Sequence, residues 1–160
     1  MNLHSIKRIV VLFWGLYFTI VVATNLCDAL KEVGVLSTTW PFASGNFGFI
    51  QQVISIYSLP DGIAWVVYII IILLEVTIAL HFWKAFLNRE GLESSSGRSV
   101  ISAFGFAISL WCIFILADEL FITYERLPGS EGGHVTGLIA QVVTLVLVLF
   151  VPWGAKNVEP

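Results

Sequence analysis

Four long apolar runs dominate this sequence and restrict the chain to very few folds. They cover about residues 9–30, 62–82, 100–120 and 135–153. Each holds close to the roughly 20 residues that an α-helix needs to cross about 30 Å of hydrocarbon. A transmembrane barrel would instead alternate apolar and polar residues. The runs therefore predict an all-α, polytopic membrane protein, with residues 1–160 forming a single four-transmembrane-helix bundle.

The composition agrees with lipid as the solvent. Of the 160 residues, 58% are apolar and 12% are charged, whereas soluble domains carry about 25% charged residues. The mean hydropathy is +0.90. The sequence contains neither a glycine-rich phosphate loop nor a G-x-S-x-G nucleophile motif, which argues against soluble-type nucleotide and hydrolase chemistry.

The first run has two interpretations. Lys7 and Arg8 precede it, as in a secretory signal. Its core is bulky, however, and no small-residue cleavage site follows it. We therefore expect this segment to remain as a true span, with removal as a signal peptide as the alternative.

Basic residues divide unequally between the two sides of the predicted bundle. Six lie on the side of the N-terminus and two on the other side. By the positive-inside rule, both termini and the connection at 83–99 are predicted to be cytoplasmic. The outer side is acidic, so nucleic acid is not expected as a partner. The basic residues are Lys7, Arg8, Lys84, Arg89, Arg98 and Lys156 on the first side and Lys31 and Arg126 on the second.

The first outer loop, at 31–61, contains a short amphipathic segment. Four apolar residues recur in it at helical spacing, and a Pro-Asp-Gly sequence ends it. About twelve residues are too few to cross a bilayer. We predict an interfacial or re-entrant helix on the outer face, lying over the mouth of the bundle. The four apolar residues are Phe47, Ile50, Ile54 and Tyr57.

Glu75 is the most informative polar residue. It lies about 20 Å from the outer end of its span at helical rise, where an ionised side chain costs about 2.5 to 3.5 kcal/mol or more. Tyr17, Thr19 and Ser109 lie at similar depth, which predicts an intramembrane polar site. One interpretation is a proton-accepting carboxyl or an ion site. The alternative, favoured because no basic residue lies within the spans, is a neutral acid that hydrogen-bonds between helices.

A second group of polar residues lies at the outer ends of the first and third spans. It comprises Asn25 and Asp28 on the first span and Asp118 and Glu119 on the third. Several carboxylates beneath the outer loop would suit a hard cation. Such a cation takes about six or more oxygen ligands, and the group supplies fewer. We therefore favour a solvated acidic rim and predict no metal.

The histidines and cysteines do not predict a cofactor. His4 and His81 belong to the inner side and His134 to the outer side, so no histidine pair faces across the hydrocarbon to hold haem. Cys27 and Cys112 differ in depth by about 9 Å at helical rise. The Cα atoms of a disulfide lie within about 7 Å of each other, so we predict two free thiols.

Small residues recur on the first and third spans at intervals of four. Such stripes let helix backbones approach closely in lipid. We expect close contact between the first and third helices, which would bring Asp28 toward Asp118 or Glu119. The apolar faces of the second and fourth helices would then remain for lipid or a partner. The small residues are Gly15, Thr19 and Ala23 on the first span and Ala103, Gly105, Ala107 and Ser109 on the third.

Several motifs together resemble a known family. They are Asn25-Leu26-x-Asp28, Asn46-Phe47-x-Phe49-Ile50-Gln51-x-Val53, Glu75 and Glu119-x-Phe121. This set resembles the bacterial small integral membrane proteins grouped as domain of unknown function 2165, over most of the chain. The resemblance implies a four-helix protein of the bacterial inner membrane and supplies no established activity.

Three functions remain open from the sequence. We favour a non-catalytic accessory or structural subunit that contacts the lipid bilayer and other integral membrane subunits or a second copy of itself. The alternative is a small proton- or ion-coupled transporter that uses Glu75 and the outer carboxylates. A third is an enzyme acting on a lipid or quinone, for which only Asp118 or Glu119 with His134 would supply an acid and a base. An enzyme is the less favoured class.

Overall fold

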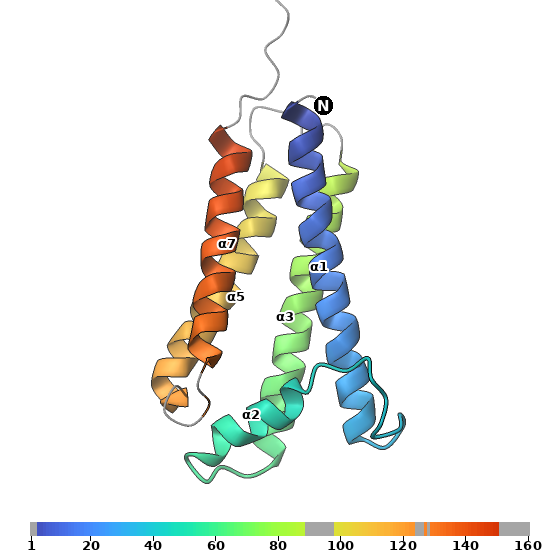
Figure 1. The fold of residues 1–160 in the computed structure, drawn as a ribbon, viewed down its shortest axis with the longest axis vertical. Coiled ribbons are helices and arrows are strands. Elements are labelled where there is room, and N and C mark those ends of the chain that lie inside the picture. The colour runs from blue at the N-terminus through green and yellow to red at the C-terminus, as the bar shows by residue number, and fades with distance from the viewer. Residues whose placement is uncertain (1–2, 89–97, 124–126, 128, 151–160) are drawn as a thin grey trace, which may run out of the picture.

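The computed structural model describes residues 3–88, 98–123, 127 and 129–150. Within these residues the chain forms five helices and no strand (Figure 1). Four of the helices are long and apolar enough to cross a membrane, which confirms the predicted fold class. They are α1 (Leu3–Glu32), α3 (Gly62–Leu87), α5 (Arg98–Phe121) and α7 (Ser130–Phe150), and the short fifth helix is α2 (Asn46–Ser55).

The helices extend beyond the predicted spans. The helix α1 begins at Leu3 instead of near residue 9. The helix α3 continues to Leu87 instead of ending near residue 82, and α7 begins at Ser130 instead of near residue 135. Hydropathy reports where lipid surrounds the chain, whereas helical hydrogen bonds continue into the polar interface. The last part of the fourth predicted span, 151–153, lies outside the described residues.

The four long helices form two antiparallel pairs. The helix α1 packs along α3, and α5 packs along α7. Contacts between α3 and α5 join the pairs, and α1 touches α7 only briefly (Figure 1). The predicted close contact between the first and third spans is therefore wrong, because α1 and α5 lie diagonally across the bundle.

The small residues of α1 explain this difference. Gly15 faces the side chains of Phe82 and Trp83 on α3, and a Cβ atom built on Gly15 would lie 3.6 Å from the Cβ atom of Phe82. The indole Nε1 of Trp83 donates a hydrogen bond to Thr19 Oγ1 at 2.9 Å. The stripe of small residues thus accommodates large aromatic rings of α3 rather than the backbone of α5.

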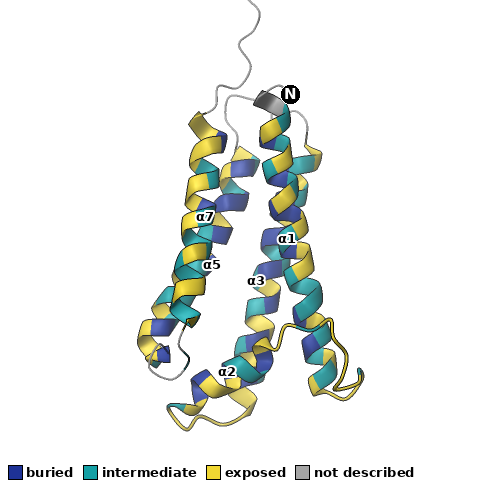
Figure 2. Ribbon diagram, in the orientation of Figure 1, coloured by how far each residue is buried: buried dark blue, intermediate teal, exposed yellow. Residues whose placement is uncertain are grey.

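Aromatic rings fill the centre of the bundle. Phe18 stacks on Phe82 with 5.9 Å between ring centroids, and Phe82 meets Phe104 edge-on at 5.0 Å. Ala103 and Ala107 of α5 are fully buried against this core. Figure 2 shows the buried residues on the inward faces of α1, α3 and α5.

The helix α7 is the least enclosed of the four. Its described buried residues are Gln141 and Val148, and the rest of its surface is half-buried or exposed (Figure 2). Trp14 of α1 ties it to the bundle by donating a hydrogen bond to Thr144 Oγ1 at 3.1 Å.

The short helix α2 covers the end of the bundle opposite the N-terminus (Figure 1). Phe47 is its main anchor, with its ring centroid 4.2 Å from that of Trp65 and 5.5 Å from that of Tyr68. Ile50 and Ile54 are buried on the same face. Tyr57 is exposed, because the helix ends at Ser55 and the chain turns there.

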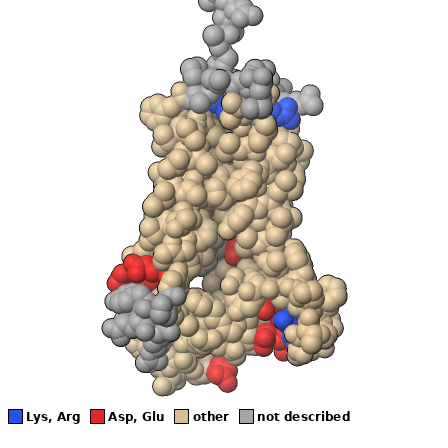
Figure 3. Space-filling model, viewed as in Figure 1, with Lys and Arg blue, Asp and Glu red and all other residues tan. Residues whose placement is uncertain are grey.

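Charges of opposite sign occupy the two ends of the molecule (Figure 3). Four of the five described basic residues lie at the end that carries the N-terminus: Lys7, Arg8, Lys84 and Arg98. The fifth, Lys31, lies at the other end, in the last turn of α1. The described acidic residues lie at the other end, apart from Glu75 in the middle of α3. They are Asp28, Glu32, Asp61, Asp118, Glu119 and Glu131.

Candidate functional site

A buried chain of hydrogen bonds joins α1, α2 and α3. Its centre is Asn25, which is fully buried on α1. Asn25 Nδ2 donates to Glu75 Oε2 at 2.6 Å, and Asn25 Oδ1 accepts from Asn46 Nδ2 at 2.9 Å. A side-chain amide both donates and accepts, so one residue connects the acid in the middle of α3 with the start of α2.

Asp28 holds the start of α2 against the bundle. Its Oδ2 atom accepts hydrogen bonds from the backbone N–H of Phe47 at 2.9 Å and from Tyr68 Oη at 3.0 Å. Ser44 Oγ donates to the same oxygen at 3.3 Å. A carboxylate near the first N–H groups of a helix satisfies an unpaired donor and complements the helix dipole. Asp28 is itself buried.

A second polar group lies at the ends of α5 and α7. Asp118 is buried, and its Oδ2 lies 2.5 Å from His134 Nδ1. Thr123 Oγ1 donates to Asp118 Oδ1 at 2.8 Å, and Ser130 Oγ donates to Thr123 Oγ1 at 3.3 Å. An ionised carboxylate only accepts hydrogen bonds. Beside an ionised Asp118, His134 Nδ1 is therefore the donor of this hydrogen bond.

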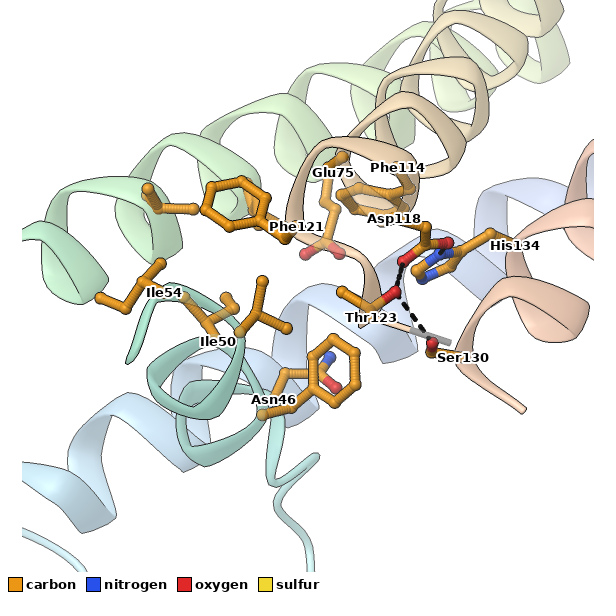
Figure 4. Close-up of a pocket in the computed structure, with 15 residues that line it drawn as sticks. Asn46, Ile50, Ile54, Glu75, Phe114, Asp118, Phe121, Thr123, Ser130 and His134 are labelled. Carbon is orange, nitrogen blue, oxygen red and sulfur yellow. Dashed lines mark hydrogen bonds and ion pairs between the residues drawn. The ribbon is translucent and has the colours of Figure 1, made fainter. Parts of the chain in front are cut away.

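A pocket of about 290 Å³ lies between these two groups. The residues Val67, Ile71 and Glu75 recur every fourth position and form its wall on α3, a stripe about 12 Å long at helical rise. The helices α5 and α2 provide the facing wall and the roof (Figure 4). Their apolar lining residues are Phe114, Ala117 and Phe121 on α5 and Phe49, Ile50, Val53 and Ile54 on α2.

Glu75 gives the pocket its acidic inner end. The side chain is only 4% exposed, and its carboxyl group points between Ile50, Phe121 and Thr123 in Figure 4. Asn25 bonds to Oε2. Among the described residues, no hydrogen bond reaches Oε1. One carboxyl oxygen is therefore available to a molecule in the pocket.

Of the residues predicted to form an intramembrane site with Glu75, the structure places Tyr17 within range of the Glu75 charge and turns Thr19 and Ser109 outward. Tyr17 packs edge-on against Trp14 and does not line the pocket. Thr19 and Ser109 are exposed and bond to carbonyl groups of their own helices. Depth along a helix does not determine the direction in which a side chain points, so equal depth did not bring Thr19 or Ser109 to Glu75.

The outer group is divided between the two polar clusters. Asn25 and Asp28 join the network of α1, α2 and α3, whereas Asp118 pairs with His134. Glu119 is exposed, as expected for one of two adjacent acids on a helix. Among the described residues, no group of three or more His, Cys, Asp or Glu side chains is placed to hold a metal ion.

The sequence predicted some of these contacts and missed others. The enzyme hypothesis had paired Asp118 with His134, which do meet. Tyr68 was missed because it stands in an uninterrupted apolar run, although a buried Tyr hydroxyl requires a partner. The roles of Thr123 and Ser130 also went unpredicted, since helix-end hydroxyls carry no periodic signal. Cys27 and Cys112 are free thiols, as predicted.

This arrangement suits binding more clearly than a reaction. The pocket has long apolar walls, a carboxyl oxygen at its inner end and the ring of His134 at its side. The site therefore offers hydrogen-bond acceptors to a molecule whose body is apolar.

No family model, curated protein or solved structure matches this chain. The resemblance to domain of unknown function 2165 therefore stays a prediction.

Proposed function

We propose that this protein binds an amphipathic small molecule of the bilayer in the pocket between α2, α3 and α5. The pocket itself is the observation that supports the proposal. Ligand sites are typically concave and mostly apolar, with few convergent polar groups and a volume of about 300 Å³ or more. The pocket has this composition and a volume of about 290 Å³.

Filling the pocket with a larger side chain tests the proposal. Val67→Phe places a ring in the α3 wall, because Val67 lines the pocket. Val66→Phe makes the same change one residue earlier, where the side chain is 55% exposed on the outer surface. The proteins are extracted from membranes in mild detergent, and bound molecules are identified by native mass spectrometry. We expect a bound bilayer molecule in the unchanged protein and Val66→Phe, and its loss from Val67→Phe.

Two results would contradict the proposal. One is an identical set of bound molecules in Val67→Phe and Val66→Phe. The other is the absence of any bilayer molecule from the unchanged protein, both in detergent and in lipid nanodiscs. Circular dichroism and size-exclusion chromatography establish that both variants are folded.

A proton- or ion-coupled transporter is the second candidate. One observation favours it: Glu75 faces the pocket and connects through Asn25 to Asn46 at the start of α2. Vesicles that contain the protein and a pH-sensitive dye would then take up protons down an imposed gradient. We expect slower uptake with Glu75→Gln. Equal rates for Glu75→Gln and the unchanged protein contradict transport through this acid.

The role as an accessory subunit also stays a prediction. It rests on the apolar outer faces of the helices, and these faces suit acyl chains equally well because lipid tails are as apolar as Leu side chains. Purification in mild detergent without any co-purifying protein counts against it. Location in a bacterial inner membrane is likewise a proposal, and it is supported by the four spans and by the family resemblance.

A further inference from the structure

We propose that the pocket selects an amphipathic organic cation, an amine or quaternary ammonium with an apolar body, and that Glu75 is its counter-ion. This inference rests on the proposed function and specifies the class of ligand. It depends on three features of the pocket: an acid without a basic partner, aromatic walls, and the charge of the lining.

The first feature is the position of Glu75. A carboxylate in the middle of a transmembrane helix normally pairs with a basic group, because an isolated charge there is costly. Among the described residues, Glu75 forms no ion pair, and its hydrogen-bond partner is the neutral amide of Asn25. A ligand that carries a positive charge would supply the missing partner and would find Oε1 available.

The second feature is the set of rings around the same space. Phe49 of α2 and Phe114 and Phe121 of α5 line the pocket. The face of an aromatic ring attracts a cation by about 0.5 to 2 kcal/mol, and quaternary ammonium groups are recognised in this way. Aromatic walls beside a buried carboxylate thus favour an organic cation over a hydrated metal ion.

The third feature is the charge of the other lining residues. None of the described lining residues is Lys or Arg, and the lining histidine, His134, is already paired with Asp118. The second acid, Asp118, is already satisfied by His134 and Thr123. An anionic headgroup would meet the Glu75 carboxylate without a compensating cation in the described lining, so phosphate and sulfate groups are disfavoured.

The geometry also orients the ligand. Glu75 lies about 12 Å further along α3 than Val67, at the inner end of the pocket. Ile50, Val53 and Ile54 of α2 line the roof at the outer end. The cationic group therefore reaches inward to Glu75, and the apolar body lies beneath α2.

Three probes with one octyl tail test the charge preference. Octyltrimethylammonium, octanol and octyl sulfate are titrated by calorimetry into the protein in nanodiscs of zwitterionic phosphatidylcholine, with empty nanodiscs subtracted. We expect the cation to bind most tightly and the sulfate to show no saturable binding. Glu75→Gln keeps an acceptor for Asn25 and removes the charge. We expect it to weaken cation binding by about 10- to 100-fold, as for the loss of one hydrogen bond to a charged group, with octanol binding unchanged.

A matched variant controls for surface charge. Glu32→Gln removes one acid from the exposed end of α1, outside the pocket, and should bind the cation as the unchanged protein does. Glu75→Asp keeps the charge, and we expect it to retain preference for the cation over octanol. Circular dichroism verifies the fold of each variant.

The outcomes separate the two proposals. If octanol and the cation bind with equal affinity, the pocket is still a binding site but does not select cations. The same conclusion follows if Glu75→Gln leaves cation binding unchanged. Preferential binding of octyl sulfate overturns the selection of cations as well. Failure of all three probes, together with no bilayer molecule bound to the extracted protein, overturns both proposals.

Discussion

The buried polar side chains of this protein are informative because each one must find its partner inside the molecule. Lipid offers no hydrogen bonds, so an unpaired buried group costs several kcal/mol. Asn25, Asp28 and Asp118 meet this requirement through hydrogen bonds between different helices or helix ends. Gln141 is the largest exception: it is fully buried, and neither atom of its amide has a partner among the described residues. The hydroxyl of Ser99 and the indole N–H of Trp111 are also buried without a partner there.

Asp28→Ala should loosen the start of α2. The change leaves the buried N–H of Phe47 without its acceptor. The hydroxyl of Tyr68 loses one contact but keeps the backbone carbonyl of Asn25 at 2.9 Å. We expect a loss of about 1 to 3 kcal/mol in the free energy of unfolding and faster hydrogen exchange of the α2 amides. Glu32→Ala removes an exposed acid four residues later on α1 and should change neither quantity. Unchanged exchange in Asp28→Ala would show that Asp28 does not hold α2.

Gln141→Met should make the protein more stable. Removing an unpartnered buried amide eliminates its desolvation penalty, which is about 1 to 3 kcal/mol, and Met has a similar shape. Thermal unfolding in detergent measures the change, with the exposed Gln52→Met as the control. A lower unfolding temperature for Gln141→Met would mean that the amide has a partner, such as an ordered water molecule.

Different interactions fix the helices in the bundle: hydrogen bonds at its ends fix α2, and close packing along its length fixes α7. The helix α2 has ten residues, too few to be stable alone in water. It is fixed at its start by Asp28 and, beyond its end, by Tyr57, whose hydroxyl donates to the carbonyl of Leu120 at 2.5 Å. The helix α7 depends on close packing against α5, where the ring of Trp111 lies over Gly137.

Gly137→Ala should weaken the pairing of α5 with α7. A Cβ atom at this position would lie 2.6 Å from the nearest ring carbon of Trp111, closer than carbon atoms pack. Overpacking of this kind costs about 1 to 3 kcal/mol. At Gly105 the same Cβ atom would meet nothing within 4 Å. Gly105→Ala should therefore leave the unfolding temperature unchanged or raise it, since Ala favours helix by about 1 kcal/mol. Equal effects of the two changes would contradict the predicted clash.

The whole molecule consists of two helix pairs with a pocket between them at the acidic end. Residues of α3 and α5 line this pocket from both pairs, and α2 provides its roof. The pocket therefore exists only because the pairs assemble in this order. A bundle with α1 beside α5 would place different side chains around Glu75.

A cysteine pair tests this order of helices. The Cβ positions of Gly15 and Phe82 lie 3.6 Å apart, within the range of about 3.5 to 4.5 Å found in disulfides. In a chain with Cys27 and Cys112 replaced by Ser, oxidation of Gly15→Cys/Phe82→Cys should remove both free thiols. Gly15→Cys/Ser109→Cys would link α1 to α5 and should stay reduced. Labelling with a maleimide polymer counts the free thiols. Formation of a disulfide between the cysteines at positions 15 and 109 would contradict the packing of α1 against α3.

The charge difference between the ends predicts the orientation in the membrane. Basic residues favour the cytoplasmic side, so the end with Lys7, Arg8, Lys84 and Arg98 should face the cytoplasm. Alkaline phosphatase, which is active only outside the cytoplasm, should be active when inserted in the loop between α1 and α2. The same enzyme fused to the C-terminus should be inactive. Activity at both positions would exclude the predicted orientation.

The number of spans, the polarity of the two ends, the extra helix in the outer loop and the special position of Glu75 all follow from the sequence. These features depend on run length, charge count and depth, which are properties of one segment at a time. The rotation of each helix and the choice of its neighbours do not follow. Runs such as Val66 to Leu74 are apolar on every side, and lipid is as apolar as a neighbouring helix. Direct packing and hydrogen bonds therefore determine that Asn25 meets Glu75, that Asp28 and Asp118 separate, and that Ser109 faces outward.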